Sequence, residues 1–308
     1  MRDRSEFIDF DPDIHMDVKP DALETYAFAR RDSLVLDALT VMAAVDYADL
    51  VIGRPAYTWK RELHVGIPVY NVDRWLLPDV GEALRDTLTF LTGDNWVLSF
   101  RHRPGVPIAK PQDSLPFEPE VRKVIAYSNG LDSRAVAGIE DHRNPKSLLK
   151  VRVGSGGKHS KTKGQPLPFT NVPYRVRLDQ RRRESSGRSR GFRHAMFGGI
   201  AAYLINSNEV VIPESGQGVF GPALTQTLQS YPDYRNHPRS TQRISVFLKA
   251  LFAHEIRYTY PRLFSTKGET LTEYLQCSDA SLSDTHSCWR DARWSSVGHK
   301  TRQCGGCS

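Results

Sequence analysis

The stretch VIAYSNGLDSRAVAGI, residues 124–139, joins an apolar strand to a helix through a short polar loop. Small and hydroxyl residues at a helix N-terminus suit an anion, because free backbone N–H groups and the helix dipole both favour phosphate. Ser128 and Ser133 add hydroxyl donors, and Gly130 lets a ligand approach the backbone closely. The alternative is a tight strand-to-helix turn without a ligand. The residue types favour the phosphate site.

Asp132 does not suit a simple phosphate site, because its carboxylate would repel the anion. The conflict disappears if a divalent cation bridges the carboxylate and the phosphates. A second glycine-rich segment, VGSGGKHSKTKG at residues 153–164, competes for the role of phosphate loop. Its spacing does not fit the P-loop pattern, since Arg152 and His159 stand where glycine and a hydroxyl residue are required.

Strands and helices alternate along the second part of the chain. We expect strands at residues 121–127, 148–153, 174–178 and 209–212, and helices near 131–141, 196–205 and 244–252. This order predicts βαβ units in a doubly wound parallel sheet, and therefore an α/β fold. Ligands of such sheets bind beyond the carboxyl ends of the strands. The loop at 128–133 follows the first strand, at such an end.

The N-terminal part has a different pattern, which predicts a small α+β domain. Its expected elements are helices near 33–52 and 80–91 and strands at 59–69 and 96–100. The segment 103–119 contains five prolines and has the composition of a linker. We therefore predict two domains, 1–118 and 119–308.

Composition indicates a soluble globular protein, with 39% hydrophobic and 25% charged residues. The net charge of +7 suits nucleotides, nucleic acids or phosphate, although many proteins are mildly basic without such a partner. The most apolar run, residues 33–53, contains Asp37, Asp46 and Asp49. It predicts a buried amphipathic helix rather than a membrane span. The N-terminus has no apolar signal segment, so we expect a cytoplasmic protein.

Two further segments are candidates for binding. Residues 181–193 carry six arginines, which is typical of a solvated face or a nucleic-acid patch, although few aromatic residues are interleaved with them. All four cysteines lie close to the end of the chain, and such clustering in a reducing compartment favours a metal site. They are Cys277, Cys288, Cys304 and Cys307.

The segment SNGLDS, residues 128–133, resembles the S-G-G-x-D-S loop of the PP-loop ATP pyrophosphatase superfamily, with Asn129 in place of the middle glycine. Asparagine tolerates left-handed backbone angles better than most other residues. The resemblance implies an adenine nucleotide alpha hydrolase-like fold that cleaves ATP between its α- and β-phosphates, with Asp132 catalytic. The implied ATP contacts are Tyr127, Ser128, Asn129, Gly130, Leu131, Asp132 and Ser133.

Three other segments are similar to the 7-cyano-7-deazaguanine synthases (QueC) of that superfamily. Arg188, Ser189 and Phe192 follow the spacing of the family's R-N-x-x-F segment, which implies a catalytic Arg188 near the phosphates. The segment VVIPESGQG, residues 210–218, stands at the place of the substrate loop. The substrate contacts implied there are Glu214 and Ser215.

The cysteine tail resembles the family's zinc site, written S-C-[YW] and then C-G-x-C-x-x-C. Cys288, Cys304 and Cys307 match this pattern and are the implied Zn²⁺ ligands. The sequence ends two residues before the last expected cysteine, so we expect a truncation, another fourth ligand, or a tail without zinc. The candidates for the fourth ligand are Cys277, His286 and His299.

The resemblance, which covers about residues 120–308, implies an ATP- and Mg²⁺-dependent ligase with a structural Zn²⁺. A deazaguanine-type carboxylate would be adenylated and then attacked by a nitrogen nucleophile, with release of pyrophosphate and AMP. The additional N-terminal part is similar to the anti-phage (QatC-type) branch. In that branch, the group that receives the activated carboxylate would be a partner protein of the defence cassette or a nucleic acid instead of ammonia.

Three alternatives stay open. The first is a biosynthetic 7-cyano-7-deazaguanine synthase of the queuosine pathway. The second is a tRNA-modifying PP-loop enzyme, although thiolases of that kind need cysteines inside the α/β core, where this sequence has none. The third is a non-enzymatic, basic, zinc-containing protein that binds nucleic acid.

Overall fold

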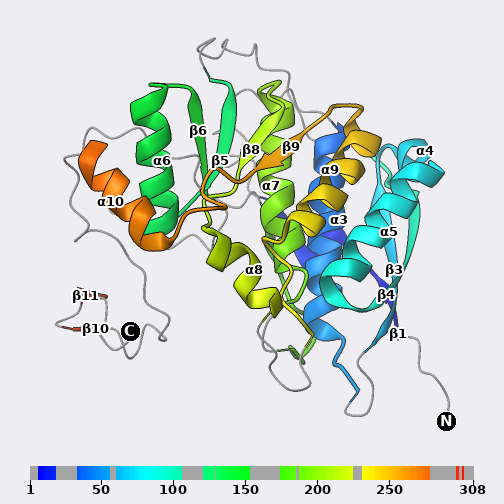
Figure 1. The fold of residues 1–308 in the computed structure, drawn as a ribbon. Coiled ribbons are helices and arrows are strands. Elements are labelled where there is room, and N and C mark those ends of the chain that lie inside the picture. Colours follow the sequence, from blue (N-terminus) through cyan, green and yellow to red (C-terminus); the bar gives the residue numbers. More distant parts are fainter. Residues whose placement is uncertain are drawn as a thin grey trace.

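The computed structural model describes residues 6–18, 33–55, 60–105, 121–128, 130–152, 174–184, 187–224 and 231–277, and the backbone of 296–297 and 300–301. One sheet has four parallel strands in the order β6-β5-β8-β9. These are β5 Lys123–Tyr127, β6 Leu148–Arg152, β8 Glu209–Val211 and β9 Arg257–Thr259. Helices α6 Leu131–Arg143 and α10 Lys267–Cys277 cover one face, and α7 Arg190–Leu204 and α9 Pro238–Phe252 cover the other (Figure 1). The predicted α/β class with a parallel sheet is confirmed.

The N-terminal part is also α/β, so the prediction of an α+β unit is wrong. Its strands lie parallel in the order β1-β3-β4. They are β1 Glu6–Asp9, β3 Glu62–Val69 and β4 Asn95–His102, and they are connected through α3 Ser33–Val51, α4 Val72–Trp75 and α5 Pro78–Thr92. A helical crossover returns the chain parallel to the preceding strand, whereas antiparallel pairing needs only a short turn. Gly93 ends α5 in the left-handed conformation, which glycine adopts without strain.

The expected third strand of the main sheet lies elsewhere. Strand β7, Tyr174–Val176, pairs antiparallel with β2, Met16–Val18, which follows α1 Pro12–His15. This two-stranded ribbon connects the N-terminal part to the second part of the chain. The other described elements are α8 Gly216–Leu224 and the antiparallel pair β10 Ser296–Val297 and β11 Lys300–Thr301.

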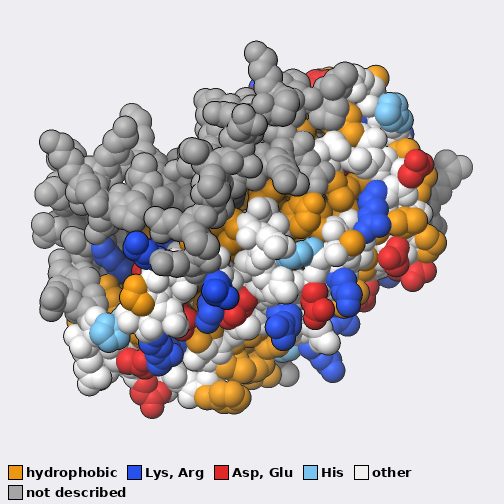
Figure 2. All heavy atoms as spheres, turned by 90° about the horizontal axis from the view of Figure 1, so that it is seen from above, with side chains coloured by type: hydrophobic (Ala, Val, Ile, Leu, Met, Phe, Trp, Pro, Cys, Tyr) orange, Lys and Arg blue, Asp and Glu red, His pale blue; other side chains and the backbone are white. Residues whose placement is uncertain are grey.

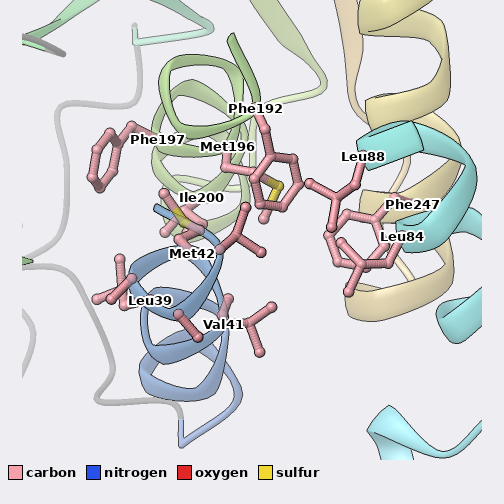
Figure 3. Close-up of a cluster of buried hydrophobic side chains, with 14 of the residues drawn as sticks. Leu39, Val41, Met42, Leu84, Leu88, Phe192, Met196, Phe197, Ile200 and Phe247 are labelled. Carbon is pink, nitrogen blue, oxygen red and sulfur yellow. The ribbon is translucent and has the colours of Figure 1, made fainter. Parts of the chain in front are cut away.

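Side chains from both predicted domains share one buried cluster. Figure 3 shows Leu84 and Leu88 of α5 near Phe192 of α7 and Phe247 of α9, and α3 and α7 side chains that lie close together. These four side chains are at most 1% exposed. The predicted linker falls mostly on residues outside the described ranges. The boundary near residue 118 therefore stays a prediction.

Helix α3 is buried on nearly all sides, so it is buried as predicted but not amphipathic. Each of its carboxylates has polar partners. Asp37 accepts hydrogen bonds from the backbone N–H groups of Tyr70 at 2.7 Å and Asn71 at 2.8 Å. Asp46 accepts from the Tyr174 hydroxyl at 2.8 Å. Among the helices of the described residues, none combines the length and apolarity needed to cross a membrane.

Asp49 belongs to a buried ion cluster centred on Arg61, which is 3% exposed. The Arg61 Nη2 group donates to Asp49 Oδ1 at 2.5 Å and to Asp94 Oδ2 at 2.6 Å. Arg54 Nη2 also donates to Asp94, at 3.0 Å. Without Arg61, the carboxylates of Asp49 and Asp94 would be buried with too little positive charge beside them. Such a loss lowers the free energy of unfolding more than the loss of an ion pair on the surface does.

We predict that Arg61→Met lowers the free energy of unfolding by roughly 3–5 kcal/mol, because it leaves Asp49 and Asp94 without their main partner. Urea denaturation monitored by circular dichroism measures the change. Arg101→Met is the matched control, since Arg101 pairs with Asp9 on the surface and should contribute only about 0–1 kcal/mol. Equal losses for the two variants would contradict the role given to Arg61.

Candidate functional site

A cavity of about 300 Å³ lies at the carboxyl ends of the neighbouring strands β5 and β8. Tyr127 lines it at the end of β5, Ser128 and Gly130 line it after β5, and Pro213 and Glu214 line it after β8. The chain continues from β5 to β6 on one side of the sheet and later returns to β8 on the other side. The cavity therefore lies where the strand order changes direction, which is where open α/β sheets bind ligands.

The loop between β5 and α6 is held by its two serine hydroxyls. The Ser128 N–H donates to Ser133 Oγ at 3.0 Å, and the Gly130 N–H donates to Ser128 Oγ at 3.0 Å. No described side chain caps the start of α6. The first N–H groups of a helix have no partner within it, so those of residues 131–133 are available to an anion. Asn129, between the two serines, lies outside the described residues.

Asp132 stands in the first turn of α6 and forms an ion pair with Lys267 at the start of α10. The Lys267 Nζ lies 2.9 Å from Asp132 Oδ2, and both side chains are partly exposed. Sequence analysis missed Lys267, because 135 residues separate it from Asp132 and no local pattern connects them. The lysine supplies the positive charge that the loop itself does not contain.

Glu214 lines the cavity and is held from two sides. Its Oε1 accepts a hydrogen bond from Asn236 Nδ2 at 3.3 Å. Its Oε2 lies against Gly218 in α8, where a Cβ would come within 2.3 Å of that oxygen. Burial, and then the charge of Asp132, raise the pKa of Glu214 to about 7, although Lys267 and Arg235 act in the opposite direction.

A histidine and an arginine form another part of the cavity wall. His194 on α7 and Arg235 in the segment before α9 both line the cavity. Burial, and then the charges of Arg193, Arg190 and Arg235, lower the pKa of His194 to about 3, so its imidazole is neutral at physiological pH. Sequence analysis did not identify either residue, because their place in the cavity depends on how α7 and α9 pack.

The other predicted site residues lie apart from this cavity. Arg188 Nη1 donates to the carbonyl oxygen of Thr92 at 3.0 Å, and its guanidinium lies 5.3 Å from the ring centre of Tyr231. Ser215 accepts the Val219 N–H through its carbonyl at 2.9 Å and is not among the lining residues. Leu131 is half-buried at the start of α6. The predicted roles of Arg188 and Ser215 stay predictions.

The arginine-rich segment is not a uniformly solvated face. Arg193 Nη1 pairs with the buried Asp46 at 3.1 Å, and the Arg183 N–H donates to the Leu50 carbonyl at 3.0 Å. Part of the segment therefore attaches the start of α7 to α3. On the face shown in Figure 2, Lys and Arg side chains are interspersed with Asp and Glu over the described part.

The predicted zinc ligands Cys288, Cys304 and Cys307 lie outside the described residues, as do His286 and His299. Cys277 ends α10 as a free cysteine. Within the described ranges, no group of three or more His, Cys, Asp or Glu side chains is placed to hold a metal. The zinc site stays a prediction.

Comparisons of the chain with protein-family models, curated proteins and solved structures found no match. The cavity, its side chains and its place at the carboxyl ends of the strands are therefore the basis for a functional proposal.

We predict that Glu214→Gln stabilises the protein at alkaline pH. Glu214 has a pKa of about 7 in the folded state and 4.5 as an ordinary carboxyl. Between these values the unfolded state ionises while the folded state stays protonated, so the wild type loses stability as the pH rises. Relative to the wild type, the free energy of unfolding of the variant should therefore increase by roughly 3 kcal/mol as the pH rises from about 4 to about 8.5.

Chemical denaturation at a series of pH values measures this gain. Glu255→Gln is the control, because the Glu255 side chain is 63% exposed. If the free energies of unfolding of Glu214→Gln and the wild type differ by the same amount at every pH, the raised pKa of Glu214 is refuted.

Proposed function

We propose that the chain is an ATP-dependent adenylating enzyme of the PP-loop type, which activates a carboxylate for attack by a nitrogen nucleophile. The observation that carries the proposal is the uncapped start of α6, which opens into a cavity at the strand-order change with Lys267 and Arg235 beside it. Helix N–H groups, a helix dipole and two cations at one place suit a polyphosphate.

The residues present fit a nucleotide with its metal ion. Mg²⁺ is usually held by one or two carboxylates together with phosphate oxygens, and Asp132 offers a partly exposed carboxylate beside the anion site. When bound, Mg²⁺ would neutralise part of the phosphate charge. Ala126, Ala195 and Val210 give the cavity an apolar side, which suits a flat ring such as adenine or a deazapurine.

The proposed reaction requires positioning and charge stabilisation rather than a protein nucleophile. A carboxylate oxygen of the substrate attacks the α-phosphorus of ATP, and the bond to pyrophosphate breaks. Lys267 and the first N–H groups of α6 would stabilise the negative charge on the phosphates. The cavity walls would hold both reactants close together, which lowers the entropic part of the barrier.

We keep the deazaguanine-type carboxylate and the anti-phage branch as the proposed substrate class and setting. The sequence resemblance supports the substrate class. The N-terminal α/β part supports the anti-phage branch, since the biosynthetic synthases lack it. This setting implies action in the cytoplasm, with a partner protein, a nucleic acid or ammonia as the acceptor.

We predict that Asp132→Asn lowers the rate of pyrophosphate release from ATP by roughly 100-fold, because the site loses the charge that would hold Mg²⁺. A coupled phosphate assay with MgATP and 7-carboxy-7-deazaguanine measures the rate. The control is Asp141→Asn, which removes a carboxylate of the same helix that pairs with Lys150 at 2.5 Å. Salt-dependent binding of RNA or DNA without any pyrophosphate release would favour the non-enzymatic alternative.

We predict that Lys267→Met weakens ATP binding by roughly 10- to 100-fold, because charge-assisted hydrogen bonds to phosphate are lost. Isothermal titration calorimetry with ATP measures the dissociation constant. Lys249→Met removes an exposed lysine of α9 and serves as the control. An unchanged dissociation constant would remove Lys267 from the phosphate site.

A further inference from the structure

The two carboxylate oxygens of Glu214 have different neighbours. Its Oε1 accepts from Asn236, whereas no described residue donates a hydrogen bond to Oε2. The side chain lines the cavity from the β8 side, close to the loop after β5. The carboxyl group of Glu214 is therefore part of the cavity wall, where a bound ligand can contact it.

We propose that Glu214 is the general base of the second step, in which Oε2 accepts the proton of the attacking nitrogen nucleophile. This inference rests on the adenylating function proposed above. It gives Glu214 a chemical role in place of the simple substrate contact that the sequence suggests.

The step balances as follows for ammonia. The nitrogen lone pair forms a bond to the acyl carbon of the acyl-adenylate, and the bond between that carbon and the phosphate oxygen breaks. AMP leaves with the electron pair of the broken bond. The nitrogen, now positively charged, passes one proton to Glu214 Oε2, and the amide remains. No oxidant or reductant takes part.

Three other titratable groups that line the cavity are poorly suited to this role. Asp132 is already paired with Lys267 at 2.9 Å. The low pKa of His194 makes its imidazole a weak proton acceptor. The Tyr258 hydroxyl donates to the Ala195 carbonyl at 2.7 Å. Of the two carboxyl groups among the described lining residues, Glu214 is thus the one not paired with Lys267, and a pKa of about 7 suits a general base at neutral pH.

The charged groups around Glu214 come from three elements. Asp132 lies on α6, Lys267 lies on α10, and Arg235 lies in the segment before α9. α8 contributes Gly218, whose missing side chain leaves room for Oε2. A side chain introduced at Gly218 would therefore displace the Glu214 carboxylate while the carboxyl group itself is kept.

The experiment separates the two steps by changing the nucleophile. Wild type and Glu214→Gln are given MgATP, 7-carboxy-7-deazaguanine and either ammonia or hydroxylamine. Hydroxylamine traps acyl-adenylates and loses its proton readily to water, so it does not need the base. We expect hydroxamate formation by Glu214→Gln within a few-fold of the wild type, and formation of the ammonia product reduced by roughly 100-fold or more.

Two further measurements distinguish a chemical role from a structural one. The wild-type rate, expressed per concentration of free ammonia, should rise as the pH passes through the pKa of Glu214 and level off above it. This rise should vanish in Glu214→Gln. Gly218→Ala should lower the ammonia-dependent rate while leaving hydroxamate formation intact, because the added Cβ displaces Oε2. Glu255→Gln is the control for the loss of a carboxyl group.

The outcomes are separable. If the wild type releases no pyrophosphate, the adenylating function falls, and this inference falls with it. If pyrophosphate is released normally but Glu214→Gln uses ammonia as fast as the wild type, only the role of Glu214 is overturned. Equal losses with ammonia and hydroxylamine would likewise overturn it, since they would indicate a defect in substrate binding.

Discussion

The guanidinium of Arg61 holds together parts of the chain that lie far apart in sequence. Its Nη2 donates to Asp49 in α3 at 2.5 Å and to Asp94 before β4 at 2.6 Å. Its Nη1 donates to the carbonyl of Ile52 at 2.6 Å. Because these charges are buried, each depends on the others for compensation. Helix α3, the start of β3 and the turn after α5 must therefore assemble together.

Asp49 extends this constraint to the cavity. Its Oδ2 accepts the backbone N–H of Ser189 at 2.7 Å, just before α7 begins. Arg193, one turn further, pairs with Asp46, one turn earlier in α3. Together the two contacts fix the position and the rotation of the first turn of α7, which brings His194 to the cavity. The N-terminal part thus positions one wall, although none of its described residues lines the cavity.

The sequence predicts the elements whose signals are local. The β5 strand, the serine loop and the start of α6 follow from one continuous stretch, and Glu214 was identified through its place after β8. Lys267 and Arg235 could not be found this way, because only the packing of α10 and α9 brings them to the cavity. The error about β7 has the same cause: a three-residue strand shows its apolar pattern but not its pairing partner.

The charge balance of the cavity explains how a carboxyl group can serve a reaction that handles anions. On the proposed pathway, a protonated Glu214 carries no charge that would repel ATP in the first step. When pyrophosphate leaves, Lys267 and Arg235 remain, and both charges favour the ionised form of Glu214. The ionised carboxylate is the form that can accept the proton of the nitrogen nucleophile in the second step.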